Sequence, residues 1–311
     1  MIFIEMVEVR NLRCATFHAN GRPPLGHPNE KLTAKNHAIS YKRTVSTSAP
    51  AVRTALITGA SSGIGLELAR LFGGDGYRLV VVARNRGALR QLADELQSRL
   101  GVEVRVVPKD LSHPAAPVEL YQELQEAGIA VDVLVNNAGF GGSGPFVQTD
   151  WNNEAEMIQV NIVAVAHLSK LFLPQIVARG GKLLNVGSVA GFLPGPYTAI
   201  YYASKAFVLH FTEALAEELS GTGATVTCLS PGPVETNFQK RAHQGGSSRA
   251  NARLGMDVRD VARLGYEGMK AGKRVVIPGW KNRMLTNLLR LVPRDTVTRI
   301  VGRMYAAKAS N

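Results

Sequence analysis

A tyrosine and a lysine four residues apart, in the segment YYASKAF, could move a proton together. Tyr201 and Lys205 would share one face of a helix, whereas Tyr202 would share a face with Ala206. A neighbouring ammonium stabilises a phenolate, so we expect the pKa of Tyr201 to lie below its ordinary value of about 10. This side chain could protonate the alkoxide that forms when a hydride adds to a carbonyl carbon, or take the alcohol proton in the reverse direction.

Ser188 stands thirteen residues before Tyr201, directly after the apolar run in LLNVGSVAG. At the end of a strand, its hydroxyl could hydrogen-bond a substrate oxygen and stabilise the charge that develops there. Lys205 could also hold the ribose of a nicotinamide cofactor. A tyrosine and a lysine at this spacing occur in many helices, so the interpretation depends on the motifs that precede them.

A glycine-rich turn, TGASSGIG, lies between a predicted strand and a predicted helix. Glycine permits the turn and lets the backbone approach a pyrophosphate, which the N–H groups at the helix start can bind. No lysine follows the last glycine, which argues against an ATP-type phosphate loop. The alternative is a turn whose glycines only close a tight connection. The expected cofactor contacts are Gly59, Ser61, Ser62, Gly63, Ile64 and Gly65.

The end of the second predicted strand indicates which dinucleotide binds. An acidic residue at this place accepts hydrogen bonds from the adenosine ribose, whereas a basic residue accommodates a 2′-phosphate. Here Ala83 occupies the acidic position and Arg84 follows it, so NADP(H) is favoured over NAD(H). The alternative is a surface arginine that selects nothing.

Two further loops are placed to contact the adenosine. KDLS follows the third predicted strand and could accept a hydrogen bond from the adenine amino group, while NNAG follows the fourth and has small residues on which adenosine could lie. Either could be ordinary loop sequence. The expected contacts are Asp110, Leu111, Asn137, Ala138 and Gly139, together with Tyr201 and Lys205.

The elements that must position these residues alternate between short apolar runs and helical periodicity. Strands are predicted over 52–58, 77–83, 102–108, 131–137, 181–188, 224–230 and 274–278, and helices over 63–73, 86–100, 114–127, 152–173, 202–219 and 257–271. Strands that are apolar on both faces and separated by helices form a parallel sheet covered on each side. We therefore predict an α/β, Rossmann-like, doubly wound parallel sheet of about seven strands.

In their order and approximate spacing, TGASSGIG, NNAG, VGS, YYASK and PGPVET resemble the motifs of the short-chain dehydrogenase/reductase family. The resemblance covers about residues 52–280. It implies a carbonyl reductase or alcohol dehydrogenase that forms a homodimer or homotetramer, in a branch that handles hydrophobic carbonyls.

The resemblance also adds site residues. Asn161 matches a position that holds a water linked to the lysine; alternatively, or in addition, it satisfies a distortion inside a helix. The segment SPGPVET matches the one that closes over the nicotinamide. Its expected cofactor contacts are Pro231, Gly232, Val234 and Thr236.

Composition divides the chain into three parts: a disordered extension over 1–50, a dinucleotide-binding catalytic domain over 51–280 and a basic amphipathic extension over 281–311. The net charge is +12, and residues 236–311 alone carry about that excess. Two distant cysteines and the lack of an evident leader favour a cytoplasmic protein. We expect no apolar run to be long enough to span a membrane, and no His/Cys cluster predicts a metal.

Two segments outside the motifs bear on substrate and partners. The loop 238–256 could select substrate as a lid or could simply be disordered. The basic helix near 281–292, which Pro293 should break, could lie on an anionic membrane or engage an acidic carrier. Packing on the enzyme body or against a second subunit is the favoured alternative. Nucleic acid is not expected, because the tail has no such motif.

These features together predict an NADP(H)-dependent oxidoreductase that interconverts a hydrophobic ketone or aldehyde and its alcohol. The alternative from another class is an NADP(H)-binding scaffold or redox sensor with little turnover. The set of Asn161, Ser188, Tyr201 and Lys205 favours the enzyme, because a protein that only binds the cofactor needs no proton relay.

Overall fold

The computed structural model describes residues 52–234, 255–289 and 291–309. The predictions for the extension 1–50, for Thr236 and for most of the loop 238–256 lie outside these residues. The strands are β1 (Thr54–Thr58), β2 (Arg78–Ala83), β3 (Val104–Pro108), β4 (Val133–Asn136), β5 (Lys182–Val186), β6 (Thr225–Leu229) and β7 (Val275–Val276). The helices are α1 (Gly63–Gly74), α2 (Arg86–Leu100), α3 (Ala116–Glu126), α4 (Trp151–Ile158), α5 (Ala164–Ala178), α6 (Ala199–Glu218), α9 (Val258–Lys270), α10 (Trp280–Leu288) and α11 (Arg294–Ala309).

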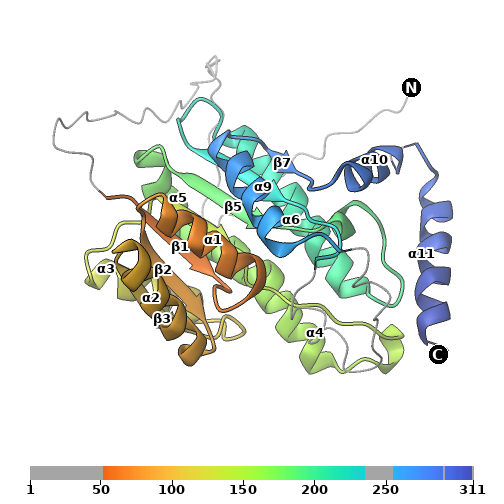
Figure 1. Cartoon of the computed structure of the whole chain (residues 1–311). Coiled ribbons are helices and arrows are strands. Elements are labelled where there is room, and N and C mark those ends of the chain that lie inside the picture. Colours follow the sequence, from red (N-terminus) through yellow and green to blue (C-terminus); the bar gives the residue numbers. More distant parts are fainter. Residues whose placement is uncertain (1–51, 235–254, 290, 310–311) are drawn as a thin grey trace, which may run out of the picture. The chain divides into compact units, whose positions relative to one another are not determined.

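The seven strands form one parallel sheet in the order β3-β2-β1-β4-β5-β6-β7 (Figure 1). This confirms the predicted doubly wound sheet. The chain reverses its direction of winding between β1 and β4, and the loops that follow these two strands lie at one edge. In such sheets ligands bind at this switch point, beyond the carboxyl ends of the strands.

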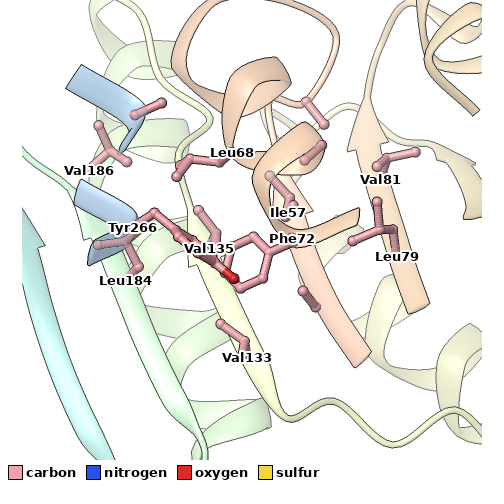
Figure 2. Close-up of a cluster of buried hydrophobic side chains, with 14 of the residues drawn as sticks. Ile57, Leu68, Phe72, Leu79, Val81, Val133, Val135, Leu184, Val186 and Tyr266 are labelled. Atoms are coloured by element: carbon pink, nitrogen blue, oxygen red, sulfur yellow. The ribbon is translucent and has the colours of Figure 1, made fainter. Parts of the chain in front are cut away.

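Two apolar layers cover the sheet because alternate residues of each strand point to opposite faces. Ile57 faces the layer of α1, α2 and α9, whereas Leu56 faces that of α3 and α5. In the first layer the rings of Phe72 and Tyr266 meet edge to face with their centroids 4.7 Å apart (Figure 2). These layers fix the strand ends on which the candidate site depends.

The helix predicted over 152–173 is not one regular α-helix. A π-helical turn, η2 (Gln159–Val163), separates α4 from α5 and contains Asn161. The local distortion predicted as one role for Asn161 is therefore present. A π turn changes the direction in which the later side chains point, so α4 and α5 face different surroundings.

The same helical stretch, Trp151–Ala178, is long and apolar enough to cross a membrane, so the expectation that no segment would be was wrong on this count. Only 50% of its most apolar window is buried inside the protein, but Leu168, Phe172 and Ile176 pack against the sheet. This packing accounts for the apolar character, since core helices of soluble domains meet the same criterion.

Buried polar side chains hold α6 to the sheet. The Asn136 amide donates to Asn185 Oδ1 at 2.9 Å and to Ser169 Oγ at 3.1 Å, and the Asn185 amide donates to Thr212 Oγ1 at 3.0 Å. Because buried polar groups are costly when left unpaired, this chain of bonds favours one placement of α6 against β4 and β5. It thereby positions Tyr201 and Lys205, which α6 carries.

The end of the chain forms two helices, α10 and α11, and Pro293 lies between them as predicted. Val297 and Val301 of α11 are buried, and Tyr305 of the same face reaches Tyr202 of α6. The second helix therefore packs on the domain rather than extending away from it.

Candidate active site

The turn between β1 and α1 brings backbone close to backbone. Gly59 and Gly63 have φ values of 65° and 61°, which L-residues with a side chain rarely adopt. Gly65 has ordinary helical backbone but no room, since a Cβ there would lie 2.5 Å from the carbonyl oxygen of Gly59. Ser62 caps α1 without a side-chain hydrogen bond, which leaves the first N–H groups of the helix to a ligand. This cradle fits a pyrophosphate.

Thr58 ties the glycine turn to the loop after β4. Its hydroxyl donates to the carbonyl of Val135 at 3.2 Å and accepts from the N–H groups of Asn137 and Ala138 at 2.9 and 3.0 Å. The Asn137 amide in turn donates to the carbonyl of Thr58 at 2.8 Å. The predicted contacts Gly59, Asn137 and Ala138 therefore share one edge of the sheet. Thr58, the first letter of the motif, was not among the predicted site residues.

Arg84 lies exposed in the turn after β2, and its Nη1 is 3.7 Å from Oδ2 of Asp110. Burial raises the pKa of Asp110, but hydrogen bonds from Ser112 and the positive charge of Arg84 outweigh it, so the pKa lies below its ordinary value. Asp110 is therefore a carboxylate at neutral pH and can accept a hydrogen bond. The two residues predicted from separate loops are neighbours.

Not every predicted contact presents its side chain. Leu111 is buried in the apolar layer with α3, and Ile64 packs against the opposite layer. Leu111 could therefore reach a cofactor only through its backbone, whereas the side chain of Ile64 is partly exposed. Ser61 and Ser62 are partly exposed at the start of α1, beside the glycines.

Tyr201, Lys205 and Ser188 come together at the carboxyl end of β5. Nζ of Lys205 lies 5.9 Å from the centroid of the Tyr201 ring and donates to the carbonyl of Val186 at 2.9 Å. Ser188 hydrogen-bonds the Tyr201 side chain and contacts the carbonyl of Pro231 at 3.4 Å. This arrangement confirms that Tyr201, and not Tyr202, shares its helix face with the lysine.

The sequence predicted a lowered pKa for Tyr201, and this prediction was wrong. The pKa is raised to about 12. Burial is the largest cause; it outweighs the hydrogen bond from Ser188, and Tyr305 raises the pKa further. Burial also lowers the pKa of Lys205 to about 8. Lys205, with a pKa of about 8, is still largely protonated at neutral pH, but its charge does not offset the effect of burial on Tyr201. At neutral pH Tyr201 is a phenol with a proton to donate.

Asn161 fixes the loop after β4 beneath the lysine. Its amide nitrogen donates to the carbonyl of Phe140 at 2.8 Å and to Ser204 Oγ at 3.1 Å, while its oxygen accepts from the N–H of Phe140 at 3.1 Å. Gly139 passes so close that an added Cβ would meet Asn161 Oδ1 at 2.9 Å and Lys205 Nζ at 3.6 Å. The predicted residue is therefore inside the site and positions its backbone.

The segment after β6 lies against Ser188. The carbonyl of Pro231 accepts from the N–H of Val189 at 2.9 Å, and Val234 forms a parallel bridge with Met256. Gly232 is packed so tightly against Asn282 of α10 that a side chain would not fit. Pro231 thus borders the site through Ser188 and Val189, Gly232 and Val234 follow it in the same segment, and Thr236 lies outside the described residues.

Tyr305 of α11 was missed by the sequence analysis. Its hydroxyl is 3.1 Å from that of Tyr202, and the two ring centroids are 6.3 Å apart. The ring of Tyr202 also meets that of Tyr201 edge to face at 6.0 Å. Val297, Val301 and Tyr305 are four residues apart, so their periodicity could have revealed a packed face, although not the surface beneath it.

Among the described residues, no three His, Cys, Asp or Glu side chains lie close enough together to hold a metal ion. The groups that converge on the switch point are instead backbone N–H groups, an arginine and the Ser–Tyr–Lys set. Such an arrangement suits a dinucleotide and proton transfer.

Comparisons with known proteins agree with this site. The family model for short chain dehydrogenases matches residues 53–246. Sulfoacetaldehyde reductase 2 of Chromohalobacter salexigens is 38% identical over 217 residues, which are 67% of this chain and 85% of that protein.

Two solved structures extend the likeness. A short-chain dehydrogenase from Sphingobium yanoikuyae in complex with NADPH is 33% identical, with a TM-score of 0.67 over 78% of this chain and 97% of that one. The bulky-bulky ketone specific alcohol dehydrogenase from Comamonas testosteroni is 31% identical, with a TM-score of 0.65 over 77% and 92%. The last three helices, α9 to α11, lie beyond the residues that the family model matches.

Replacing Gly65 with alanine should disrupt the cradle. The new methyl group would collide with the Gly59 carbonyl and with the Asn137 amide. We expect Gly65→Ala to lower the free energy of unfolding by about 2 kcal/mol and to weaken NADPH binding at least about tenfold. Gly74→Ala is the matched control, because nothing lies within 4 Å of a Cβ there. Urea unfolding and NADPH fluorescence titration measure both effects; equal behaviour of the two variants would contradict the close approach.

Replacing Lys205 with methionine should stabilise the cofactor-free protein at neutral pH. Lowering the pKa from 10.5 to about 8 means that the buried ammonium costs about 3 kcal/mol below pH 8, and this cost vanishes above about pH 10.5. Loss of the bond to Val186 offsets about 1–2 kcal/mol. We expect Lys205→Met to raise the free energy of unfolding by about 1–2 kcal/mol at pH 7, as measured in urea, but not above pH 10.5.

The control for this substitution is Lys170→Met on the exposed face of α5, which should change stability by less than about 0.5 kcal/mol. A Lys205→Met variant that is less stable than the parent at pH 7 would show that the buried amine does not lower the free energy of unfolding.

Proposed function

This chain belongs to the short-chain dehydrogenase family, and on that premise we propose that it is an NADP(H)-dependent oxidoreductase that interconverts a hydrophobic ketone or aldehyde and its alcohol. One observation carries the proposal: Tyr201, Ser188 and Lys205 meet at the end of β5. The glycine cradle at the β1–α1 turn lies at the same edge of the sheet. A protein that only bound the dinucleotide would need the cradle but not the proton donor.

The residues that would hold the cofactor follow from the site. The N–H groups at the start of α1 would bind the pyrophosphate, Asp110 would accept from the adenine amino group, and the backbone of Ala138 and Gly139 would lie beside the adenosine. Pro231 and Gly232 would border the nicotinamide. When bound, the nicotinamide supplies or accepts the hydride.

Tyr201 then moves the proton that accompanies the hydride. In reduction, its phenol donates H⁺ to the carbonyl oxygen while the carbon gains the hydride, so the C=O group becomes CH–OH; in oxidation, both transfers reverse. The raised pKa of Tyr201 favours the protonated form that reduction requires. Ser188 would hold the same substrate oxygen by its hydroxyl. Lys205 lies beside the tyrosine ring and would hold the ribose.

Arg84 supports the preference for NADP(H). It is exposed at the end of β2, where the adenosine ribose of a bound dinucleotide would lie, and no carboxylate occupies position 83. A guanidinium donates several charge-assisted hydrogen bonds to a phosphate. Its contact with Asp110 is long enough, at 3.7 Å, to be exchanged for a phosphate at small cost.

An apolar substrate is supported by the aromatic side chains around the proton donor. Tyr202 and Tyr305 form a wall beside Tyr201, and Pro196 packs near Gly302 of α11. Rings of this kind bury large apolar area. The names of the two related enzymes, an aldehyde reductase and a ketone-specific alcohol dehydrogenase, have the carbonyl group in common.

Replacing Tyr201 with phenylalanine tests the enzyme against the scaffold or sensor. Loss of the only proposed acid should lower turnover of a responsive ketone or aldehyde by at least about 100-fold, while NADPH binding stays within about threefold. The neighbouring variant Tyr202→Phe should keep most of the turnover. Absorbance of NADPH at steady state and fluorescence titration measure the two properties. Normal turnover of Tyr201→Phe would reject the proposed acid.

Replacing Arg84 with aspartate tests the cofactor preference. A carboxylate would repel the 2′-phosphate and accept from the ribose hydroxyls, so the ratio of kcat/KM for NADPH to that for NADH should fall at least about 100-fold. Arg90→Asp, at an exposed position of α2 six residues further along the chain, controls for the change in charge. The same fall in both variants would assign the preference to overall charge rather than to Arg84.

A further inference from the structure

Helix α10 carries its apolar side chains on the outside. Trp280, Met284, Leu285 and Leu288 are exposed to 68%, 50%, 49% and 50%, and Leu291 just beyond the helix to 82%. The positions 280, 284 and 288 recur every four residues, so they lie on one side of the helix. We call these five residues the α10 apolar face. Contiguous exposed apolar residues of this kind mark an interaction site.

The opposite side of α10 is polar and faces the protein. Thr286 is only 2% exposed, and its hydroxyl donates to the carbonyl of Arg283 at 3.0 Å. Asn282 donates to the carbonyl of Pro278 at 2.8 Å and packs on Gly232. A helix that packed on the domain for stability would turn its leucines inward. In α10 the polar residues face the domain and the apolar residues face outward. Apolar packing on the enzyme body therefore does not hold this helix in place.

Exposed cations without acidic partners accompany the exposed apolar side chains on both α10 and α11. Lys281 and Arg283 on α10 and Arg294, Arg299 and Arg303 on α11 are exposed. Within the described part of the chain, none of them forms an ion pair, whereas Arg70, Arg105, Arg179 and Lys270 of the domain each have a carboxylate within 4 Å. Lys281 lies 5.8 Å from the centroid of the Trp280 ring, so charge and apolar surface adjoin. Cations without acidic partners beside apolar side chains favour an anionic partner that also accepts apolar groups.

We propose that the α10 apolar face docks the protein on an anionic lipid membrane surface. The apolar side chains would enter the boundary between headgroups and acyl chains while the surrounding cations contact lipid phosphates and carboxylates. Helix α10 has nine residues, which is too short to cross a bilayer, so it lies on the membrane rather than spanning it.

The charge near the α10 apolar face favours an anionic membrane over a second copy of the chain as the partner. Two α10 faces brought together would place Lys281 and Arg283 of one copy near the same cations of the other, and like charges across an interface oppose association. A bilayer with acidic headgroups offers the complementary charge and an apolar interior at one surface. Ile300 and Met304, exposed to 52% and 59% beside Arg299 and Arg303, repeat this combination on α11.

Docking would place the membrane near the reaction site. The inner side of α10 rests on Gly232, in the segment that borders Ser188 through Pro231. An apolar carbonyl compound dissolved in the bilayer would therefore be close to Tyr201. This consequence rests on the proposed function, but the docking itself does not.

Sedimentation with vesicles tests the docking. The full chain should bind phosphatidylcholine vesicles that contain phosphatidylserine, bind those of phosphatidylcholine alone much less, and lose affinity as salt is raised. The double variant Leu285→Ser/Leu288→Ser should bind at least about tenfold more weakly. Leu100→Ser is the matched control, because Leu100 is 46% exposed at the end of α2; its binding should equal that of the parent.

Fluorescence gives a second readout that depends on depth. The chain has two tryptophans, so in a Trp151→Phe variant the emission comes from Trp280 alone. Its emission maximum should move to shorter wavelength on addition of the anionic vesicles. Failure of the parent to sediment, or sedimentation without any such shift, would overturn the proposal.

Measuring the mass of the protein in solution tests whether the α10 apolar face instead binds a second copy of the chain. The double serine variant should keep the mass of the parent by analytical ultracentrifugation, with unchanged thermal unfolding. A smaller mass for this variant, with no vesicle binding by the parent, would overturn the proposal and assign the face to contact between copies. None of these measurements uses enzyme activity. If the proposed oxidoreductase activity were disproved, the result on membrane docking would still stand.

Discussion

The site depends on keeping the amine of Lys205 buried, close to Tyr201 and paired with a backbone carbonyl. Taking a cation out of water is costly, and the lowered pKa of Lys205 is the measure of that cost. The surrounding structure accommodates it with the carbonyl of Val186, the side-chain-free backbone of Gly139 and the amide of Asn161, which holds the Gly139–Phe140 loop in place. Each of these groups comes from a different element, so the site exists only when β5, the loop after β4, the π turn and α6 are assembled.

The sequence contained enough to predict the sheet and most of the site, because these depend on local signals. Helix α2 was predicted with its observed bounds, since Asn85 caps its start by accepting from Ala88 and Gly101 ends it at a φ of 67°. The glycine turn and the spacing of Tyr201 and Lys205 likewise need only neighbouring residues. Order along the chain then placed these motifs at one edge of the sheet.

The sequence could not provide the properties that are set by distant parts of the chain. Burial raises the pKa of Tyr201, and Tyr305, from the far end of the sequence, raises it further. A backbone distortion at Asn161 was one of the expectations from the sequence, but its form, a π-helical turn over Gln159–Val163, was not. The periodicity of residues 280–288 indicated an amphipathic helix. It does not indicate which face of that helix contacts the rest of the domain, and in the structure the polar face does.

The π turn also makes the chain unequally tolerant of changes in length. Each residue added to or removed from a helix rotates the remainder of that helix by about 100°, so one insertion between Asn161 and Phe172 would turn one of these two side chains away from its partners. An insertion among the exposed residues Phe146–Gln148 before α4 would rotate nothing that is packed. Relatives of this chain that differ in length should therefore differ in the loops flanking this helix, while the residue count from the π turn to the end of α5 stays constant.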